Sequence, residues 1–101
     1  MNARILIALD ALQQLAEAAV VHQDKAQTLA AANEAVLAAV ASRSNRIQAV
    51  VELLDGLALR LKRGRISKVA HKRLLALVAQ MMRDQVNCDD ACVDLIDKRL
   101  G

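Results

Sequence analysis

Apolar side chains recur at spacings of three and four residues through almost the whole chain, and this pattern restricts the fold more than any other feature. One stretch runs from Ile5 to Val40, a second from Ile47 to Leu61, and a third from Ala70 to Met81. Such spacing places side chains on one face of an α-helix, where they bury against a neighbouring helix. We therefore expect an all-α fold, built as a helical bundle.

The composition agrees with this pattern. The chain has 101 residues, no Pro, three Gly and no Phe, Tyr or Trp. Few residues therefore interrupt a helix, and the abundance of Ala and Leu favours helix in nearly every segment. A chain of this length has room for one hydrophobic core, so we expect a single helical domain over residues 1–101.

Local signals place the helix ends. Asn45 can cap the start of a helix, and so can Ser67, because a short side-chain oxygen accepts free amides of the first turn. Gly64 suits the residue after a helix C-terminus, where the backbone turns left-handed, and Asn87 or Asp89 can begin a last, short helix. The predicted helices are 3–41, 45–63, 67–86 and 88–100, the second and third forming an antiparallel pair.

The first of these segments has two interpretations. No Gly or Pro breaks residues 3–41, which favours one helix of about 40 residues, roughly 58 Å long. The alternative is a break near His22–Asp24, with Asp24 capping a second helix. One long helix would leave part of its apolar stripe uncovered, which favours a homo-oligomer, most simply a homodimer. The predicted self-association seam consists of Ile5, Leu9, Leu12, Ala19, Ala26, Ala30 and Leu37.

The net charge of +3 is unevenly distributed along the chain. Residues 1–41 and 74–101 each sum to −2, whereas residues 42–73 sum to +7. Seven of these cations lie within fourteen residues that contain no acid, and we call them the basic cluster. Its members are Arg60, Lys62, Arg63, Arg65, Lys68, Lys72 and Arg73.

The basic cluster has three interpretations. It can be a solvated helix end that keeps the protein soluble, a docking site for an acidic protein surface, or a site for nucleic acid. Two helices joined by a short Gly-containing turn resemble a helix-turn-helix. The second helix would lack the Asn or Gln that reads adenine, because it presents Lys68, Val69, Lys72 and Arg73. The chain also has no aromatic side chain to stack on bases.

No group of residues suggests catalysis or metal binding. Cys88 and Cys92 share a helix face, but structural zinc usually requires four Cys or His ligands, and only His22 and His71 occur elsewhere. We expect a buried thiol pair and two exposed histidines. No catalytic residue, cofactor or metal ligand is predicted.

One enzyme family has a comparable layout. A long helix followed by two shorter ones and a tail resembles the small helical chorismate mutases, in which Arg and Lys side chains of the long helix clamp a dicarboxylate. Here the corresponding segment offers only Arg4 and Lys25. The resemblance is limited to the layout, and it implies no catalytic residues in this chain.

These patterns favour a small cytoplasmic adaptor or regulator that is not an enzyme. Two cysteines without a secretory leader suit a reducing compartment, and no apolar run is long enough to cross a membrane. The expected partner is another protein, with an acidic surface, bound by the basic cluster of a homodimer. The alternative is a nucleic-acid-binding protein that uses residues 60–73.

Overall fold

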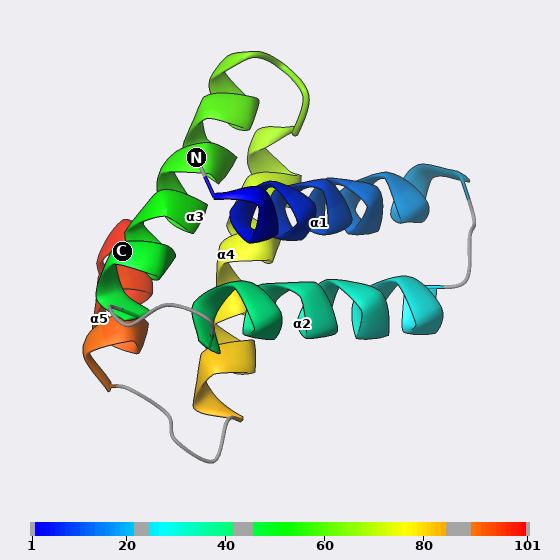
Figure 1. Cartoon of the computed structure of the whole chain (residues 1–101). Coiled ribbons are helices and arrows are strands. Elements are labelled where there is room, and N and C mark those ends of the chain that lie inside the picture. Colours follow the sequence, from blue (N-terminus) through cyan, green and yellow to red (C-terminus); the bar gives the residue numbers. More distant parts are fainter. Residues whose placement is uncertain (1, 22–24, 42–45, 85–89, 101) are drawn as a thin grey trace.

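The computed structural model describes residues 2–21, 25–41, 46–84 and 90–100. It contains the helices α1 (Ala3–Val21), α2 (Lys25–Ala41), α3 (Arg46–Lys62), α4 (Lys68–Arg83) and α5 (Asp90–Leu100), shown in Figure 1. No strand occurs within the described ranges. The prediction of an all-α bundle is confirmed.

The N-terminal segment is divided between two helices. α1 ends at Val21, α2 begins at Lys25, and the two lie side by side in opposite directions (Figure 1). The prediction of one long helix is therefore wrong, and the alternative with a break is confirmed. As a hairpin, the two halves bury their apolar faces against each other, which a single extended helix could not do. The likeness to the layout of the chorismate mutases is lost with the long helix.

The other predicted helices agree with α3, α4 and α5 to within a few residues. Several predicted signals lie outside the described residues. They are the Asp24 cap, the Ser42–Asn45 turn with its cap at Asn45, and the helix start at Asn87 or Asp89.

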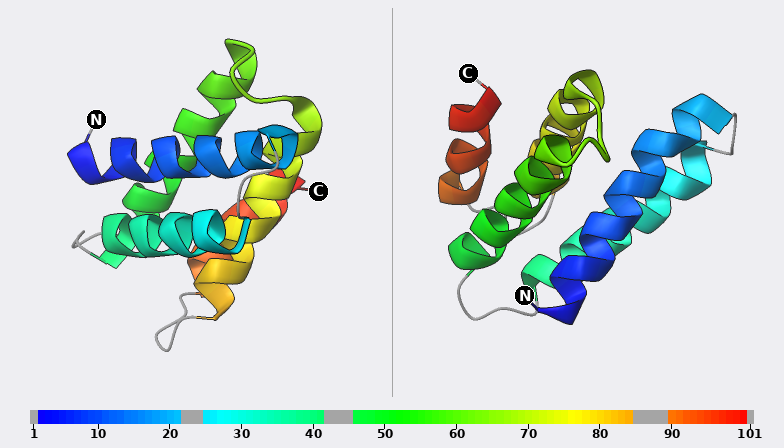
Figure 2. Two further views of the ribbon diagram at one scale, coloured as in Figure 1. Left: turned by 90° about the vertical axis from the view of Figure 1, so that its right-hand side faces the viewer. Right: turned by 90° about the horizontal axis from the view of Figure 1, so that it is seen from above.

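The helices form three layers, which are clearest from above (Figure 2, right). The α1–α2 hairpin makes one outer layer, α3 and α4 make the middle layer, and α5 covers the opposite side. Two ion pairs join α5 to the middle layer: Arg99 contacts Asp55 of α3 at 2.9 Å, and Arg83 of α4 contacts Asp97 at 3.2 Å.

Aliphatic side chains from every helix fill the core between the layers. α1 contributes Ile5, Leu9 and Leu12, each at most 1% exposed, and α5 contributes Ile96, which is fully buried. Burial of one such side chain contributes about 1.5–3 kcal/mol. Other large buried residues are Val36, Val50, Leu53, Leu54, Leu57, Leu74 and Val78.

Gly56 allows α1 to cross α3 at close range. A Cβ atom at this position would lie 2.5 Å from Cδ1 of Leu9, closer than a Cβ atom approaches a non-bonded atom in proteins. A glycine normally weakens a helix interior, but here the absent side chain makes space for Leu9. This crossing fixes the hairpin against the middle layer.

None of the described helices is both long enough and apolar enough to cross a membrane.

Candidate binding surfaces

The turn between α3 and α4 is fixed by backbone hydrogen bonds. The amide of Arg65 donates to the carbonyl of Arg60 at 2.9 Å, and the amide of Gly64 donates to the carbonyl of Leu61 at 3.0 Å. These two bonds form a Schellman motif, in which the residue after the helix is left-handed. Gly64 has a φ of 74°, as the sequence predicts for this position.

The chain then enters α4 through an anchor and a cap. Ile66 is 4% exposed and belongs to the hydrophobic core, so it holds the middle of the turn against the protein. Ser67 is the N-cap, and its hydroxyl accepts a hydrogen bond from the amide of Ala70 at 3.1 Å. The prediction for Ser67 is confirmed. The basic cluster therefore surrounds a turn whose backbone conformation is fixed by these hydrogen bonds and by the burial of Ile66.

Arg60 differs from the rest of the basic cluster. Its side chain is 13% exposed, and its Nη2 lies 2.8 Å from Oδ1 of Asp10, fifty residues earlier in the chain. Its Nη1 donates to the side chain of Gln13. The assignment of Arg60 to partner binding is therefore corrected, because this guanidinium ties α3 to α1.

The remaining members of the basic cluster all lie at the surface. Within the described part of the chain, none of them forms a hydrogen bond or an ion pair through its side chain. They are Lys62, Arg63, Arg65, Lys68, Lys72 and Arg73. These six charges therefore stay available to a binding partner.

The charges at the start of α4 oppose its dipole. The N-terminal end of a helix carries partial positive charge, which favours acidic side chains nearby. The first turn of α4 has no acidic residue and contains Lys68. Cations at this end cost a few tenths to about 1 kcal/mol each. An anion bound at this turn would offset that cost.

The predicted self-association seam is largely internal. Ile5, Leu9 and Leu12 are buried in the core of the single chain, and Leu37 packs against that core. A second copy of the chain could reach these residues only if the hydrophobic core opened. The prediction that they mediate self-association is therefore corrected, because they pack within one chain. The predicted homodimer thereby loses its main physical argument, which was an uncovered stripe on one long helix.

The other residues of the seam are less informative. Ala26 and Ala30 of α2 remain exposed, while the side chain of Ala19 lies outside the described residues.

Cys92 is buried, with 1% of its surface exposed. Its predicted neighbour Cys88 lies outside the described residues, as does His22. No group of three or more His, Cys, Asp or Glu residues in the described ranges is arranged to hold a metal ion.

His71 is half-buried, contrary to the prediction that it is exposed. Its Nε2 atom is buried without a hydrogen-bond partner among the described residues. Burial, and to a lesser extent the charge of Arg99, lowers the pKa of His71 from its ordinary value of 6.5. α5 packs against α4, and the charge of Arg99 acts on this side chain. The surroundings of His71 therefore depend on tertiary packing, which the local sequence does not indicate.

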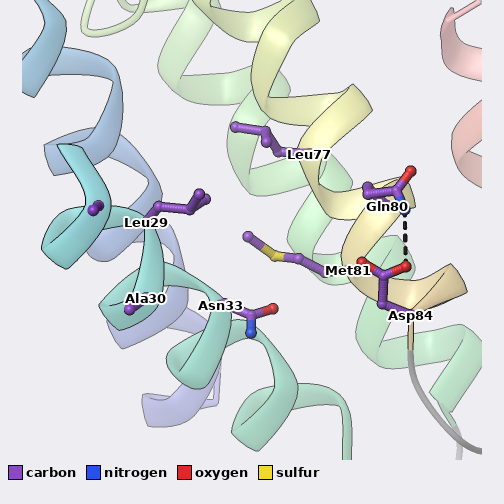
Figure 3. Close-up of a pocket in the computed structure, with 8 residues that line it drawn as sticks. Leu29, Ala30, Asn33, Leu77, Gln80, Met81 and Asp84 are labelled. Atoms are coloured by element: carbon purple, nitrogen blue, oxygen red, sulfur yellow. Dashed lines mark hydrogen bonds between the residues drawn. The ribbon is translucent and has the colours of Figure 1, made fainter.

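A pocket between α2 and α4 has no counterpart in the sequence prediction. It has a volume of about 410 Å³ and is lined by Ala26, Leu29, Ala30, Asn33, Leu77, Gln80, Met81 and Asp84. Figure 3 shows Leu29 and Asn33 on the α2 wall, facing Leu77 and Met81 on the α4 wall. Apolar pockets of 300–1,000 Å³ with a few polar groups are typical of ligand sites.

Neither the family models nor the curated proteins nor the solved structures include a match to this chain. The surfaces themselves must therefore support any functional proposal.

Proposed function

We propose that this protein is a non-catalytic adaptor that binds an acidic surface of another protein through its basic cluster. The supporting observation is that six exposed cations surround a fixed turn without an ion pair in the described part of the chain. Like charges held close together repel each other, and an acidic partner would relieve this repulsion. The proposed location is the cytoplasm, a reducing compartment in which free thiols are usual.

Val69 supports a protein as the partner. Its side chain is 63% exposed, and it lies on α4 one turn before Lys72 and Arg73, directly after Lys68. Protein interfaces commonly have an apolar centre within a polar rim. An exposed valine among cations suits such an interface better than contact with a phosphate backbone alone.

Nucleic-acid binding is the second candidate, favoured by one observation. α4 follows a short turn that contains Gly64, and cations occupy its first two turns, as in the recognition helix of a helix-turn-helix. However, the exposed residues of this half of α4 include no Asn or Gln, and the whole chain lacks aromatic residues. Any binding would therefore be electrostatic, with a log–log salt slope of about −0.9 per phosphate contacted.

Photo-cross-linking from position 69 tests the proposal. Val69→p-benzoylphenylalanine places the reactive group within the basic cluster while the other side chains are kept. We expect an adduct in living cells with a protein that carries an acidic surface, and this adduct should survive nuclease treatment. Neutralising Lys68 and Lys72 as Gln should remove it.

The matched control neutralises two exposed cations outside the basic cluster, Arg4→Gln with Lys98→Gln. This variant loses the same charge and should keep the adduct. An adduct that disappears with nuclease would favour the second candidate. The absence of any adduct, or equal loss in the control, would show that the basic cluster is not a specific docking site.

A further inference from the structure

The α2–α4 pocket has an electronegative end. Asp84 is the C-cap residue of α4, and Nε2 of Gln80 donates a hydrogen bond to its Oδ1 at 2.8 Å, shown as the dashed line in Figure 3. The C-terminal end of a helix carries partial negative charge. The carboxylate and the helix end therefore add their negative potentials at the same edge of the pocket.

The cation adjacent to Asp84 in the sequence is engaged by another helix. Arg83 is next to Asp84, but its guanidinium contacts both carboxylate oxygens of Asp97 in α5, each at 3.2 Å. The carboxylate of Asp84 accepts only the hydrogen bond from the Gln80 side chain among the described residues. An acid at a helix C-terminus is unfavourable for that helix, and the Gln80–Asp84 pair offsets only about 0.2–0.5 kcal/mol of that cost.

The rest of the pocket is aliphatic. Leu29, Leu77 and Met81 point into the space between the helices, and the small side chain of Ala30 leaves room for a ligand (Figure 3). Leu29 is 40% exposed although its neighbours offer apolar contacts. An alkyl chain seated here would cover apolar surface that now contacts water. Met81 has a flexible thioether that adapts to such a chain.

We propose that the α2–α4 pocket binds a small amphiphilic cation, with an alkyl chain among Leu29, Leu77 and Met81 and a protonated amine at Asp84. The carboxylate supplies the opposite charge, and the amide of Asn33 faces the same end of the pocket from α2. This ligand site is separate from the basic cluster and does not depend on the function proposed for that cluster.

A titration with two ligands of equal chain length tests this proposal. n-Octylammonium is the probe, n-octanoate has the same chain with the opposite charge, and methyl resonances of Leu29, Leu77 and Met81 report binding. We expect saturable shifts with n-octylammonium, with a Kd of about 1 mM or tighter. n-Octanoate should give no saturable shift, because Asp84 and the end of α4 repel it.

Three variants assign the interaction to the pocket. Asp84→Asn should weaken n-octylammonium binding about three- to ten-fold, whereas Asp94→Asn removes an exposed acid of α5 and should leave it unchanged. Ala30→Leu fills the pocket at a position exposed to solvent, so it should abolish binding without unfolding the chain.

The proposal is overturned if n-octylammonium gives no saturable shift, or if n-octanoate binds equally well. Binding that is unaffected by Ala30→Leu would place the ligand elsewhere on the protein. A helical peptide with a Leu–Lys pair is a further probe. If it shifts these methyl resonances while n-octylammonium does not, the pocket accepts a protein side chain and the small-ligand proposal is wrong.

Discussion

α4 and α5 pack against each other, yet they arrange their charges along the helix axis in opposite ways. α5 begins with Asp90 and ends with Lys98 and Arg99, the order that its own dipole favours. α4 begins with Lys68 in its first turn and has Asp84 as its C-cap residue. The charges of α5 thus stabilise α5. In α4, Lys68 and Asp84 are unfavourable for the helix, and only Arg83 in its last turn follows the favoured order.

This difference separates charges that serve the fold from charges that are left for binding. Arg83 and Arg99 are used to hold α5 on the middle layer through Asp97 and Asp55. Lys68 and Lys72 contact no acid within the described ranges. The basic cluster and the negative end of the pocket lie at opposite ends of α4, so one helix offers two surfaces of opposite charge.

The largest effect should come from the buried face of α5. Ile96 is fully buried, and Ile96→Ala should lower the free energy of unfolding by about 2–5 kcal/mol, as deletions in well-packed cores do. Urea denaturation measures this change. A loss below about 1 kcal/mol would mean that ion pairs, and not burial, hold α5 in place.

The turn before α4 should give the next largest effect. Gly64→Ala forces an L-residue into a left-handed conformation at a φ of 74°, although no atom within 4 Å would clash with the new methyl group. We expect a loss of about 1–2 kcal/mol, all of it from backbone strain. Thermal unfolding checks the loss, and unchanged stability would show that the turn adapts freely.

Charge reversals at the starts of α4 and α5 test the comparison directly. Lys68→Glu should raise the free energy of unfolding by about 0.3–1 kcal/mol, and Asp90→Lys should lower it by a similar amount. The same urea protocol at low salt measures both variants. If Lys68→Glu destabilises the protein, Lys68 has a structural role and the distinction between the two helices fails.

The smallest effect concerns His71 of α4, whose pKa is influenced by Arg99 of α5. Its pKa is lowered in the folded chain, so on acidification the unfolded chain binds a proton first. The stability that His71 contributes above pH 6.5 is therefore lost as the pH falls below 6.5. His71→Gln should flatten the pH dependence of the melting temperature between about pH 7.5 and 5.5. An identical pH dependence in both proteins would contradict this assignment.

Local signals predicted the turn from Gly64 to Ser67 because short-range backbone geometry determines these positions. The break between α1 and α2 was harder to predict, because the apolar spacing continues through residues 3–41 and no Gly or Pro interrupts it. The apolar faces of α1 and α2 bury against each other, and this tertiary packing favours the break. The spacing of apolar residues along the sequence does not show such packing.

Long-range contacts account for the other differences. Arg60 has the same local surroundings as the other cations of its cluster, but Asp10 and Gln13 come from the distant α1. The pocket forms where Leu29 of α2 faces Leu77 of α4, and the sequence of either helix alone does not indicate it. The small Ala26 and Ala30 were the available signal, and the sequence interpretation assigned them to self-association.

The free energy of unfolding of a quadruple variant tests most directly whether the basic cluster serves binding and not the fold. The variant neutralises Arg63, Arg65, Lys68 and Lys72 as Gln, while Arg60 stays paired with Asp10. We predict unchanged or higher stability, with the gain larger at low salt, because mutual repulsion is removed. A loss of more than about 1 kcal/mol, beyond the range of exposed charges, would show that these cations hold the fold together and would contradict the proposed role.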